Sequence, residues 1–543
     1  MNKSIFSNLD ISYLTDKLGI ELFTLARGSY DSLALDGIVT GGISDRFLAG
    51  LLFENSIPSD FFNSKVNLRK FIEALPRKYK VSIRDNFDLR SIKWDDSLFR
   101  FLEENYGIND RFRPSMKAIK TGSEAALFFD KPDIVYKNLK DYQSIIFHEV
   151  YEYVRSVNFA RCILQMPTGS GKTRTAMEIV SEYLNEHSSS VIWLANTEEL
   201  VDQAFESFRE VWEVRRKKPL AAYNHMRFSG DIDFGQQSFH LSTLQGLNTK
   251  NGKELIDMIL TSKPGIGLVI VDEAHISIAP TYRSTIKHLL SKEGKLVGLT
   301  ATPGRTINRF DGDKTDDNKE LSEFYLNKLF QIDTGDKPPI DFLRERGILS
   351  NAKFFSIEGS YIESCLTPAE KMKMNETKKI PAMILGRLSN NSRRNAIIID
   401  KLQKLLAANK KILFFATSIE HSKVIASIIN LLGYNAAHVD GETGATRAKV
   451  IQQFKNGDLR LLSNFGVLTT GFDDPKIDVV FMARPTNSIV LYSQVIGRGL
   501  RGPSIGGTEV CEIYTVVDNM IDLPNNNEIY SYFNEYFINT NAI

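Results

Sequence analysis

Short apolar runs alternate with segments of helical periodicity in two separate stretches of the chain. In the first stretch, the runs expected to be strands are 161–165, 191–195, 239–243, 267–271 and 296–299. In the second stretch, they are 411–416, 436–439, 461–463, 479–482 and 512–516. Strands that alternate with amphipathic helices predict a parallel sheet with helices on both faces. The pattern therefore predicts an α/β protein with two tandem parallel-sheet domains.

The same periodicity divides the chain into five expected parts. They are an accessory domain (1–135), a first α/β domain (136–305), a linker or insert (306–392), a second α/β domain (393–525) and a tail (526–543). Apolar residues in the accessory domain follow helical spacing, which predicts an α-rich fold. The linker opens with charged and polar residues at 311–318, which predict a mobile loop. The tail is rich in Asn, Tyr and Phe and has no predicted role.

Composition and charge limit the class of protein. Of the 543 residues, 42% are hydrophobic and 24% are charged, as is usual for globular chains. The 67 basic residues nearly balance the 66 acidic ones, so the formal net charge is +1. The chain as a whole therefore has no basic field, and any nucleic-acid site must be a local groove.

The cysteines and the lack of long apolar runs predict a cytoplasmic protein. Cys162, Cys365 and Cys511 lie far apart in the sequence, which excludes a zinc ribbon or a four-cysteine iron–sulfur cluster. The same scatter argues against a disulfide framework. No run of 18 apolar residues occurs, and the first ten residues lack the apolar centre of a signal peptide. We therefore expect no contact with a membrane.

A glycine-rich loop follows the first predicted strand and precedes a helical pattern. Its sequence is Gln165-Met166-Pro167-Thr168-Gly169-Ser170-Gly171-Lys172-Thr173. Glycines let backbone amides turn toward phosphates, and a helix N-terminus adds partial positive charge. We therefore expect an ATP site made by Thr168, Gly169, Ser170, Gly171, Lys172 and Thr173. Lys172 would reach the β- and γ-phosphates, and Thr173 would place its hydroxyl on Mg²⁺.

Two carboxylates end a predicted buried strand about 100 residues later. The apolar run 267–271 leads into Asp272-Glu273-Ala274-His275. Asp272 would hold Mg²⁺ through its water shell, and Glu273 would orient and deprotonate the attacking water. An exposed acidic turn would explain these four residues alone. Their place after the glycine-rich loop favours phosphoryl-transfer chemistry.

Together, the loop and the carboxylates resemble the DEAD/DEAH-type superfamily 2 helicases. The resemblance implies two RecA-like domains and covers about residues 139 to 525. Met166 stands where the strict phosphate-loop pattern has Gly, and the variant Pro-Thr-Gly-Ser-Gly-Lys-Thr is the form found in these motors. Three further segments are similar to the restriction-subunit, XPB-like branch: Arg484-Pro485-Thr486, Tyr492-Ser493-Gln494 and Gly497-Arg498-Gly499.

The resemblance implies more contacts with the nucleotide. Gln143 lies in a segment similar to the element that reads the adenine edge, although a helix start capped by Asp141 explains the same residues. Gly471 and Asp473 lie in a segment that resembles motif V, which links the nucleotide to the strand. They are therefore expected to contact ATP.

The segment from Gln494 to Arg501 matches motif VI. Its arginines, Arg498 and Arg501, are three residues apart on a helical pattern, so they are expected to share one face. An arginine stabilises charge on a transferring phosphoryl group by a forked contact. We expect both to act as fingers that the second domain supplies to ATP held on the first.

Other matching segments imply contacts with the nucleic-acid backbone. The implied residues are Thr197 (motif Ia), Ser242 and Thr243 (motif Ic), Thr417 (motif IV), and Thr469 and Thr470 (motif V). Many family members have an Arg where this chain has Glu198, which removes one expected phosphate contact. Backbone contacts carry little sequence information, so binding is expected to be sequence-independent.

The first 135 residues match none of these motifs. They contain no His, which excludes HKD-type and HNH nucleases there. Lys78, Lys80, Arg84, Arg90 and Lys93 form either a basic face or an ordinary solvated charge run. We expect a helical accessory domain that docks a protein partner, with a nuclease subunit as one candidate.

The motifs predict an ATP-dependent helicase or translocase that acts on nucleic acid, with DNA favoured over RNA. One alternative is the ATPase subunit of a DNA-restriction or anti-phage complex whose nuclease lies on another chain. A second alternative is a nucleotide-gated clamp that binds nucleic acid without unwinding it. Such a clamp would hydrolyse ATP slowly and would displace no strand.

Overall fold

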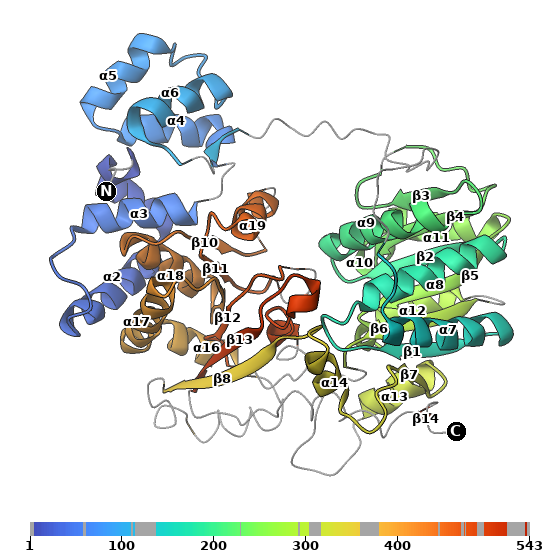
Figure 1. Ribbon diagram of the computed structural model, residues 1–543. Helices are drawn as coiled ribbons and strands as arrows, with labels where there is room; N and C mark the ends of the chain where they lie inside the picture. Colours follow the sequence, from blue (N-terminus) through green and yellow to red (C-terminus); the bar gives the residue numbers. More distant parts are fainter. Residues whose placement is uncertain are drawn as a thin grey trace.

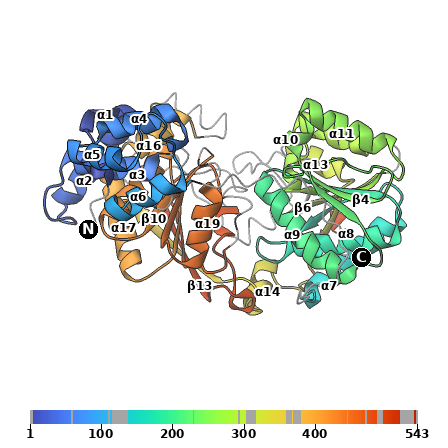
Figure 2. The same ribbon diagram turned by 90° about the horizontal axis from the view of Figure 1, so that it is seen from above.

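The chain forms two α/β units that stand side by side, with N-terminal helices against the second unit (Figures 1 and 2). The computed structural model describes residues 5–57, 61–109, 112–114, 137–228, 230–290, 294–302, 316–358, 367, 380–441, 443, 446–468, 472, 474–485, 494–517 and 538–539. Among these residues, no helix combines the length and the apolar character needed to span a membrane.

Parallel strands build the sheet of the first unit. They are β1 (Arg161–Gln165), β2 (Ser190–Ala195), β3 (Ala221–Asn224), β4 (Ser238–Thr243), β5 (Ile266–Asp272), β6 (Lys295–Thr300), β7 (Lys328–Gln331) and β14 (Ile538–Asn539). Their order is β14-β7-β1-β6-β5-β2-β4-β3. Side chains of β5 alternate between two cores, with Leu268 and Ile270 in one and Val269 and Val271 in the other. Because the strands are parallel, their carboxyl ends meet at one edge of the sheet.

Helices cover both faces of this sheet. Those on one face are α7 (Asp141–Ser156), α8 (Lys172–Glu186) and α9 (Glu198–Arg215). Those on the other face are α10 (Leu244–Leu247), α11 (Lys250–Thr261), α12 (Pro280–Leu289) and α13 (Asp316–Phe324). Thr197, Thr243 and Thr249 cap α9, α10 and α11 with their side-chain oxygens, as the preference of Thr for helix starts predicts.

The second unit repeats the architecture with a smaller sheet. Its strands are β8 (Asn351–Glu358), β9 (Ile412–Phe415), β10 (Ala436–Val439), β11 (Leu461–Asn464), β12 (Val479–Met482) and β13 (Val510–Val517), in the order β10-β11-β9-β12-β13-β8. Its helices are α16 (Ala382–Ser389), α17 (Ser392–Ala407), α18 (Ile419–Leu431) and α19 (Thr446–Asn456). Helix α14 (Pro339–Glu345) lies between the two units. The predicted fold class, two tandem RecA-like sheet domains with a helical N-terminal region, is confirmed.

The N-terminal helices contribute to two different cores. They are α1 (Ile11–Leu18), α2 (Ile20–Leu35), α3 (Asp45–Ser56), α4 (Lys65–Ala74), α5 (Arg77–Asn86) and α6 (Asp96–Tyr106). Leu25 of α2 and Leu52 of α3 are buried in the core of the second unit with α17 and α18. The approach is close, since a Cβ on Gly28 would lie 2.6 Å from Ser392 Oγ. Helices α4 to α6 instead surround an aromatic core that includes Phe62 and Trp94.

The region expected to be a linker or insert contributes strands to both sheets. Strand β7 pairs with β1 in the first unit, and β8 pairs with β13 in the second. The expected mobile loop at 311–318 lies outside the described residues up to 315, and α13 begins at Asp316. In the expected tail, β14 pairs with β7.

Candidate functional site

The glycine-rich loop joins the carboxyl end of β1 to α8, whose first residue is Lys172. Gly169 and Gly171 have φ angles of +93° and +87°, in the left-handed region that favours glycine. The Ser170 hydroxyl donates to the Pro167 carbonyl at 2.7 Å, which closes the turn. Thr168 and Thr173 are half-buried at either end of the loop. The first amides of a helix have no acceptor within the helix, so the start of α8 at this position suits an anionic ligand.

Helix α7 supports the loop from one side. Tyr142 Oη and Gln143 Nε2 both donate to the Ser170 carbonyl, at 2.8 and 3.0 Å. Gln143 Oε1 accepts from the backbone amide of Lys140 at 2.9 Å, so its side chain also caps the helix. Asp141 is the first residue of α7 and not its cap. In this arrangement the side chain of Gln143 positions the phosphate loop by a hydrogen bond to the loop's backbone.

Two carboxylates stand opposite the loop at the end of β5. Lys172 Nζ lies 3.9 Å from Glu273 Oε1, and only 12% and 13% of these side chains is exposed. Glu273 has a φ of +57°, a strained conformation for a non-glycine residue that is most often retained at functional sites. Asp272 Oδ1 accepts from the Glu273 amide at 3.0 Å, and His275 Nδ1 lies 3.4 Å from Glu273 Oε2.

Burial and charge shift the two carboxylates in opposite directions. Burial raises the pKa of Asp272 to about 6, against the opposing effect of Lys172. Burial would also raise the pKa of Glu273, but Lys172, His275 and Arg498 outweigh it and hold that pKa below its ordinary value. Glu273 is therefore ionised at neutral pH, as a group that accepts a proton from water must be.

Both arginines of the last motif reach this site from the second unit. A Cβ on Gly169 would collide with Arg501 Nη1, so that guanidinium lies directly against the phosphate loop. Arg498 Nη1 donates to the Phe472 carbonyl at 2.7 Å. Its positive charge helps to lower the pKa of Glu273 and opposes the rise in the pKa of Asp272. Gln494 adds a side-chain hydrogen bond to Glu273.

The arginines converge by a route different from the expected one. They were expected on one face of a helix, but helical residues end at Ile496 and a turn follows at 497–499. Gly499 permits this turn because a Cβ there would collide with Cys511 Sγ of β13. The turn against β13, and not helical spacing, directs both side chains to the first unit.

The site combines three cations with two carboxylates. Among the described residues, Lys172, Arg498 and Arg501 outnumber Asp272 and Glu273, so these five side chains together have a net positive charge. Together with the amides of the glycine-rich loop, this arrangement fits a nucleoside polyphosphate. The expected contacts Gly471 and Asp473 lie outside the described residues.

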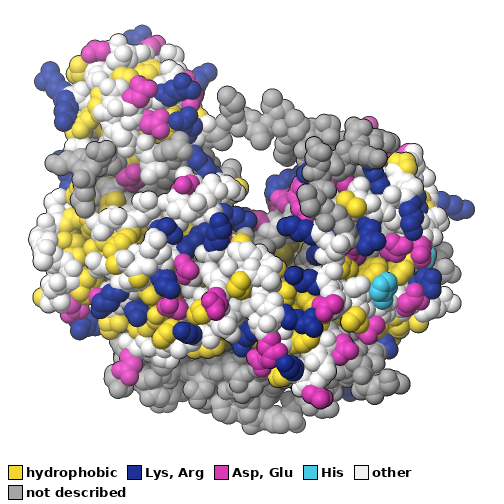
Figure 3. Space-filling view, viewed as in Figure 1, with side chains coloured by type: hydrophobic (Ala, Val, Ile, Leu, Met, Phe, Trp, Pro, Cys, Tyr) yellow, Lys and Arg dark blue, Asp and Glu magenta, His cyan; other side chains and the backbone are white. Residues whose placement is uncertain are grey.

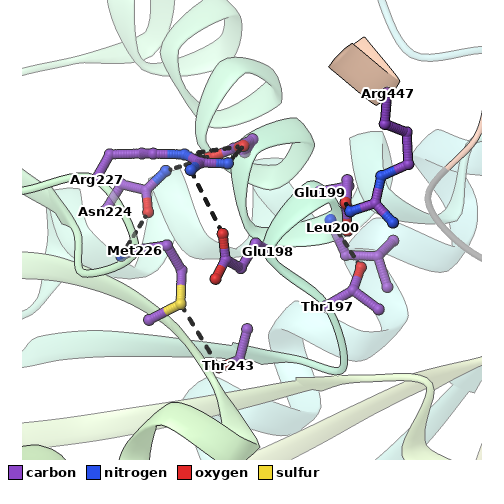
Figure 4. A network of polar contacts seen from close by, with 10 residues as sticks. Thr197, Glu198, Glu199, Leu200, Asn224, Met226, Arg227, Thr243 and Arg447 are labelled. Carbon is purple, nitrogen blue, oxygen red and sulfur yellow. Dashed lines mark hydrogen bonds and ion pairs between the residues drawn. The ribbon is translucent and has the colours of Figure 1, made fainter. Parts of the chain in front are cut away.

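The described hydroxyls expected to contact nucleic acid have hydrogen-bond partners within the protein; Figure 4 shows those of Thr197 and Thr243. Thr197 accepts from the Leu200 amide at 3.4 Å, and Thr243 accepts from the Gly246 amide at 2.9 Å. Ser242 donates to the Thr243 carbonyl at 3.4 Å, and the buried Thr417 donates to the Ala483 carbonyl at 3.2 Å. Thr197 only accepts in its bond, so its hydroxyl can still donate to a phosphate. Ser242, Thr243 and Thr417 donate within the protein and would have to exchange an acceptor first. Thr469 and Thr470 lie outside the described residues.

Two arginines near these hydroxyls form ion pairs that the sequence did not predict. Arg447 of α19 pairs with Glu199 of α9 and thereby links the two units (Figure 4). Arg227 pairs with Asp202 at 2.7 Å and lies 3.4 Å from Glu198, the residue that replaces the usual Arg. Both pairs join residues more than 20 positions apart, so local spacing gives no signal for them.

Comparisons with known proteins agree with this geometry. The family described as "Type III restriction enzyme, res subunit" matches residues 136–305, and "Helicase conserved C-terminal domain" matches residues 397–502. These two ranges contain the glycine-rich loop with its carboxylates and the two arginines, respectively.

Relatives and one solved structure extend over both units. Irc3 of Saccharomyces cerevisiae, named as a candidate ATP-dependent helicase, is 26% identical over 67% of this chain and 49% of its own length. A 51.5 kDa protein of a Lactococcus phage is 26% identical over 62% of this chain and 62% of its own length. The chain thus spans about half to three-fifths of these relatives.

A fragment of a candidate HsdR subunit of a type I restriction enzyme from Vibrio vulnificus covers 78% of this chain and 70% of its own. It is 18% identical with a TM-score of 0.48. On the two matching families and their motifs, the chain belongs to the superfamily 2 helicases, in the restriction-subunit branch.

Proposed function

We propose that this protein is an ATP-dependent nucleic-acid motor, a helicase or translocase, with its ATP site between the two α/β units. One observation carries the proposal: Arg498 and Arg501 of the second unit face Lys172 and Glu273 of the first. A site divided in this way couples the state of the nucleotide to the separation of the units. Closure on ATP brings the arginines to the transferring phosphoryl group, and product release frees them.

Each group at the site has a distinct role in this proposal. Lys172 and the loop amides hold the β- and γ-phosphates, and Gln143 favours adenine or steadies the loop. Glu273 orients the attacking water and takes its proton, since its pKa is held low. Arg498 and Arg501 stabilise the charge that develops on the phosphoryl oxygens.

We also propose a magnesium ion beside the nucleotide, held by Thr173 and Asp272. Asp272 fits this role because it is a buried carboxylate whose pKa is raised, and a nearby divalent cation favours the ionised form of such a group. The ion would neutralise charge on the phosphate oxygens. Gly471 and Asp473 complete the proposed nucleotide contacts.

The proposed nucleic-acid track crosses from α9 and α10 of the first unit to α19 of the second unit. Thr197, Ser242, Thr243 and Thr417, with Thr469 and Thr470, are the proposed backbone contacts. Rearrangement of the Arg447–Glu199 pair would release a cation there as the units move. DNA is favoured because the first unit matches a restriction-enzyme family. A cytoplasmic location is in keeping with the buried free thiols of Cys162 and Cys511.

Steady-state ATPase measurements test the proposal directly. Turnover is compared without nucleic acid and with single-stranded DNA, duplex DNA and RNA, using Glu273→Gln as the blank. We expect a rise of about tenfold or more with DNA, since the strand contacts complete the closed state. Equal turnover under all four conditions would contradict the motor and favour the nucleotide-gated clamp.

A second candidate is the motor subunit of a restriction or anti-phage complex. It is favoured by the restriction-enzyme family match of residues 136–305, and it gives the N-terminal helices a protein partner, with a nuclease as one candidate. Plasmid DNA incubated with the purified chain and ATP should remain intact. Cleavage by the chain alone, lost in Glu273→Gln, would contradict a separate nuclease.

A further inference from the structure

The charge of the chain is not evenly spread. Residues 65–93 contain nine Lys and Arg and three Asp and Glu, a surplus of six. The formal net charge of the whole chain is +1, so the remaining residues have a net charge of −5. This basic segment forms α4, α5 and the loop after them. Together with α6 it makes up a small helical module, α4 to α6. A charge surplus confined to one such module needs a local explanation.

Three of these cations line one face of α5. Arg77, Lys80 and Arg84 are separated by three and four residues, so they share one side of the helix. Ile83 on another side of the helix is fully buried in the aromatic core of the module. Arg77 and Arg84 are exposed, and Lys80 is half-buried. No ion pair joins any of the three to a residue within the described ranges.

Two acidic residues of α6 are paired with arginines outside α5. On α6 and just after it, Asp96 pairs with Arg100 at 2.7 Å, and Glu103 pairs with Arg113 at 3.0 Å. Arg69 of α4 instead donates to the carbonyl of Arg90 at 3.2 Å, which brings two more cations together. Asp96 and Glu103 are therefore engaged by Arg100 and Arg113, and not by the cations of α5. Lys and Arg side chains project from the rim of the lobe that α4 to α6 form (Figure 3).

The module is firmly attached to the second unit. Leu18 and Phe23 pack against both the aromatic core and the core of the second unit. A Cβ on Gly50 of α3 would lie 2.6 Å from Ser7 Cα, so the layers meet without a gap. Figure 1 shows α4 to α6 beyond α3, on the side of the second unit away from β8. A ligand bound to the module would therefore be held in a fixed relation to the second unit.

We propose that Arg77, Lys80 and Arg84 form a binding face for the phosphate backbone of nucleic acid, outside the groove between the two units. Unpaired cations spaced along a helix match a row of phosphates and require no base readout. The face would hold the polymer on the second unit while the first unit is released. The inference rests on the proposed function only for the identity of the polymer.

Binding of labelled oligonucleotides across a salt series tests this inference with the full chain. The test variant is Arg77→Gln/Lys80→Gln/Arg84→Gln. The matched control is Lys263→Gln/Lys287→Gln/Lys476→Gln, which removes three exposed and unpaired cations that precede β5, β6 and β12, on the opposite edge from the ATP site. Thermal melting and ATP binding confirm that both variants are folded.

We expect the test variant to lower the slope of log K against log salt by about 2 to 3 and to weaken binding by about tenfold or more, since each phosphate contact contributes about 0.9 to the slope. The control should match the wild type. If the test variant loses affinity for duplex DNA alone, the face binds duplex DNA. If it loses affinity for both duplex and single-stranded DNA, the face binds the phosphate backbone in general. Unchanged slopes on both polymers would overturn the inference and leave an acidic protein partner.

The outcome is separable from that of the proposed motor. At saturating DNA the test variant should keep the wild-type kcat and shift only the DNA concentration for half-maximal stimulation. If the wild type shows no DNA-stimulated ATPase but its binding still depends on α5, the face is real and the motor is wrong. If DNA stimulates both proteins equally at all concentrations, the motor stands and the face is wrong.

Discussion

Substituting Gly169 by Ala tests whether the arginines of the second unit act at the phosphate loop. A Cβ at this position would lie 3.0 Å from Leu349 Cδ2 and closer still to Arg501 Nη1. To restore an ordinary van der Waals separation of about 3.5 Å, Arg501 must withdraw by on the order of 1 Å. Displacing a catalytic group by that distance costs about 100-fold in rate.

The substitution also has a conformational cost that must be separated from this effect. An Ala at φ +93° is strained by about 1–2 kcal/mol. Gly433 provides the matched control, because its φ is +91° and no described atom lies within 4 Å of a Cβ built there. Gly433→Ala should therefore lower stability by a similar amount and leave kcat unchanged. Gly169→Ala should lower both stability and kcat.

A double-mutant cycle with Arg501→Ala identifies the cause of the lost activity. We expect Gly169→Ala to lower kcat about 100-fold in the wild type and only a few-fold when Arg501 is already absent. Single-turnover ATP hydrolysis at saturating DNA is the assay, with binding of a labelled ATP analogue as a check. If Gly169→Ala lowers kcat by the same factor with and without Arg501, the contact between the units is not the reason for the lost activity.

Three further substitutions probe the remaining groups. Lys172→Ala should lower kcat by at least about 100-fold and weaken ATP binding, because the only Lys beside Glu273 among the described residues is lost. Wild-type turnover in this variant would show that Lys172 is not part of the ATP site. Arg498→Ala should lower kcat by about 1,000-fold while the Kd for ATP changes only a few-fold; lost binding with unchanged turnover per bound ATP would contradict a finger. Asp272→Asn should raise the melting temperature of the nucleotide-free protein at pH 7.5. Burial raises the pKa of Asp272 to about 6, so its ionised form costs stability above that pH, and the cost disappears as pH falls toward its ordinary value of 3.8. An equal gain in melting temperature at pH 4.5 and pH 7.5 would contradict a destabilising ionised Asp272.

Strands in the centre of each sheet were predictable from the sequence. The runs 161–165 and 479–482 coincide with β1 and β12 because residues buried on both faces leave a continuous apolar signal. The missed strands are at or near the sheet edges. In β8, Phe354 and Phe355 are 49% and 40% exposed and polar residues surround them, so no clear pattern marks a strand.

The residues of the proposed ATP site and their division between the two domains were predicted from the sequence, but the local contacts that bring the arginines there were not. The turn at Gly499 that directs Arg498 and Arg501 depends on contact with β13, which local spacing does not reveal. The Arg447–Glu199 pair likewise joins helices of different units. The attachment of α2 to the second unit depends on α17, more than 350 residues away. Tertiary contacts of this kind are set by packing and not by local pattern.

Displacement of a triplex-forming oligonucleotide from duplex DNA tests the central claim most directly, because it reports movement along the polymer and needs no strand separation. The wild type with ATP should displace the third strand in a single-exponential phase after a lag that grows with the distance from the loading end. Glu273→Gln and a non-hydrolysable ATP analogue should displace none. DNA-stimulated ATPase without displacement would contradict the motor and identify the chain as a nucleotide-gated clamp.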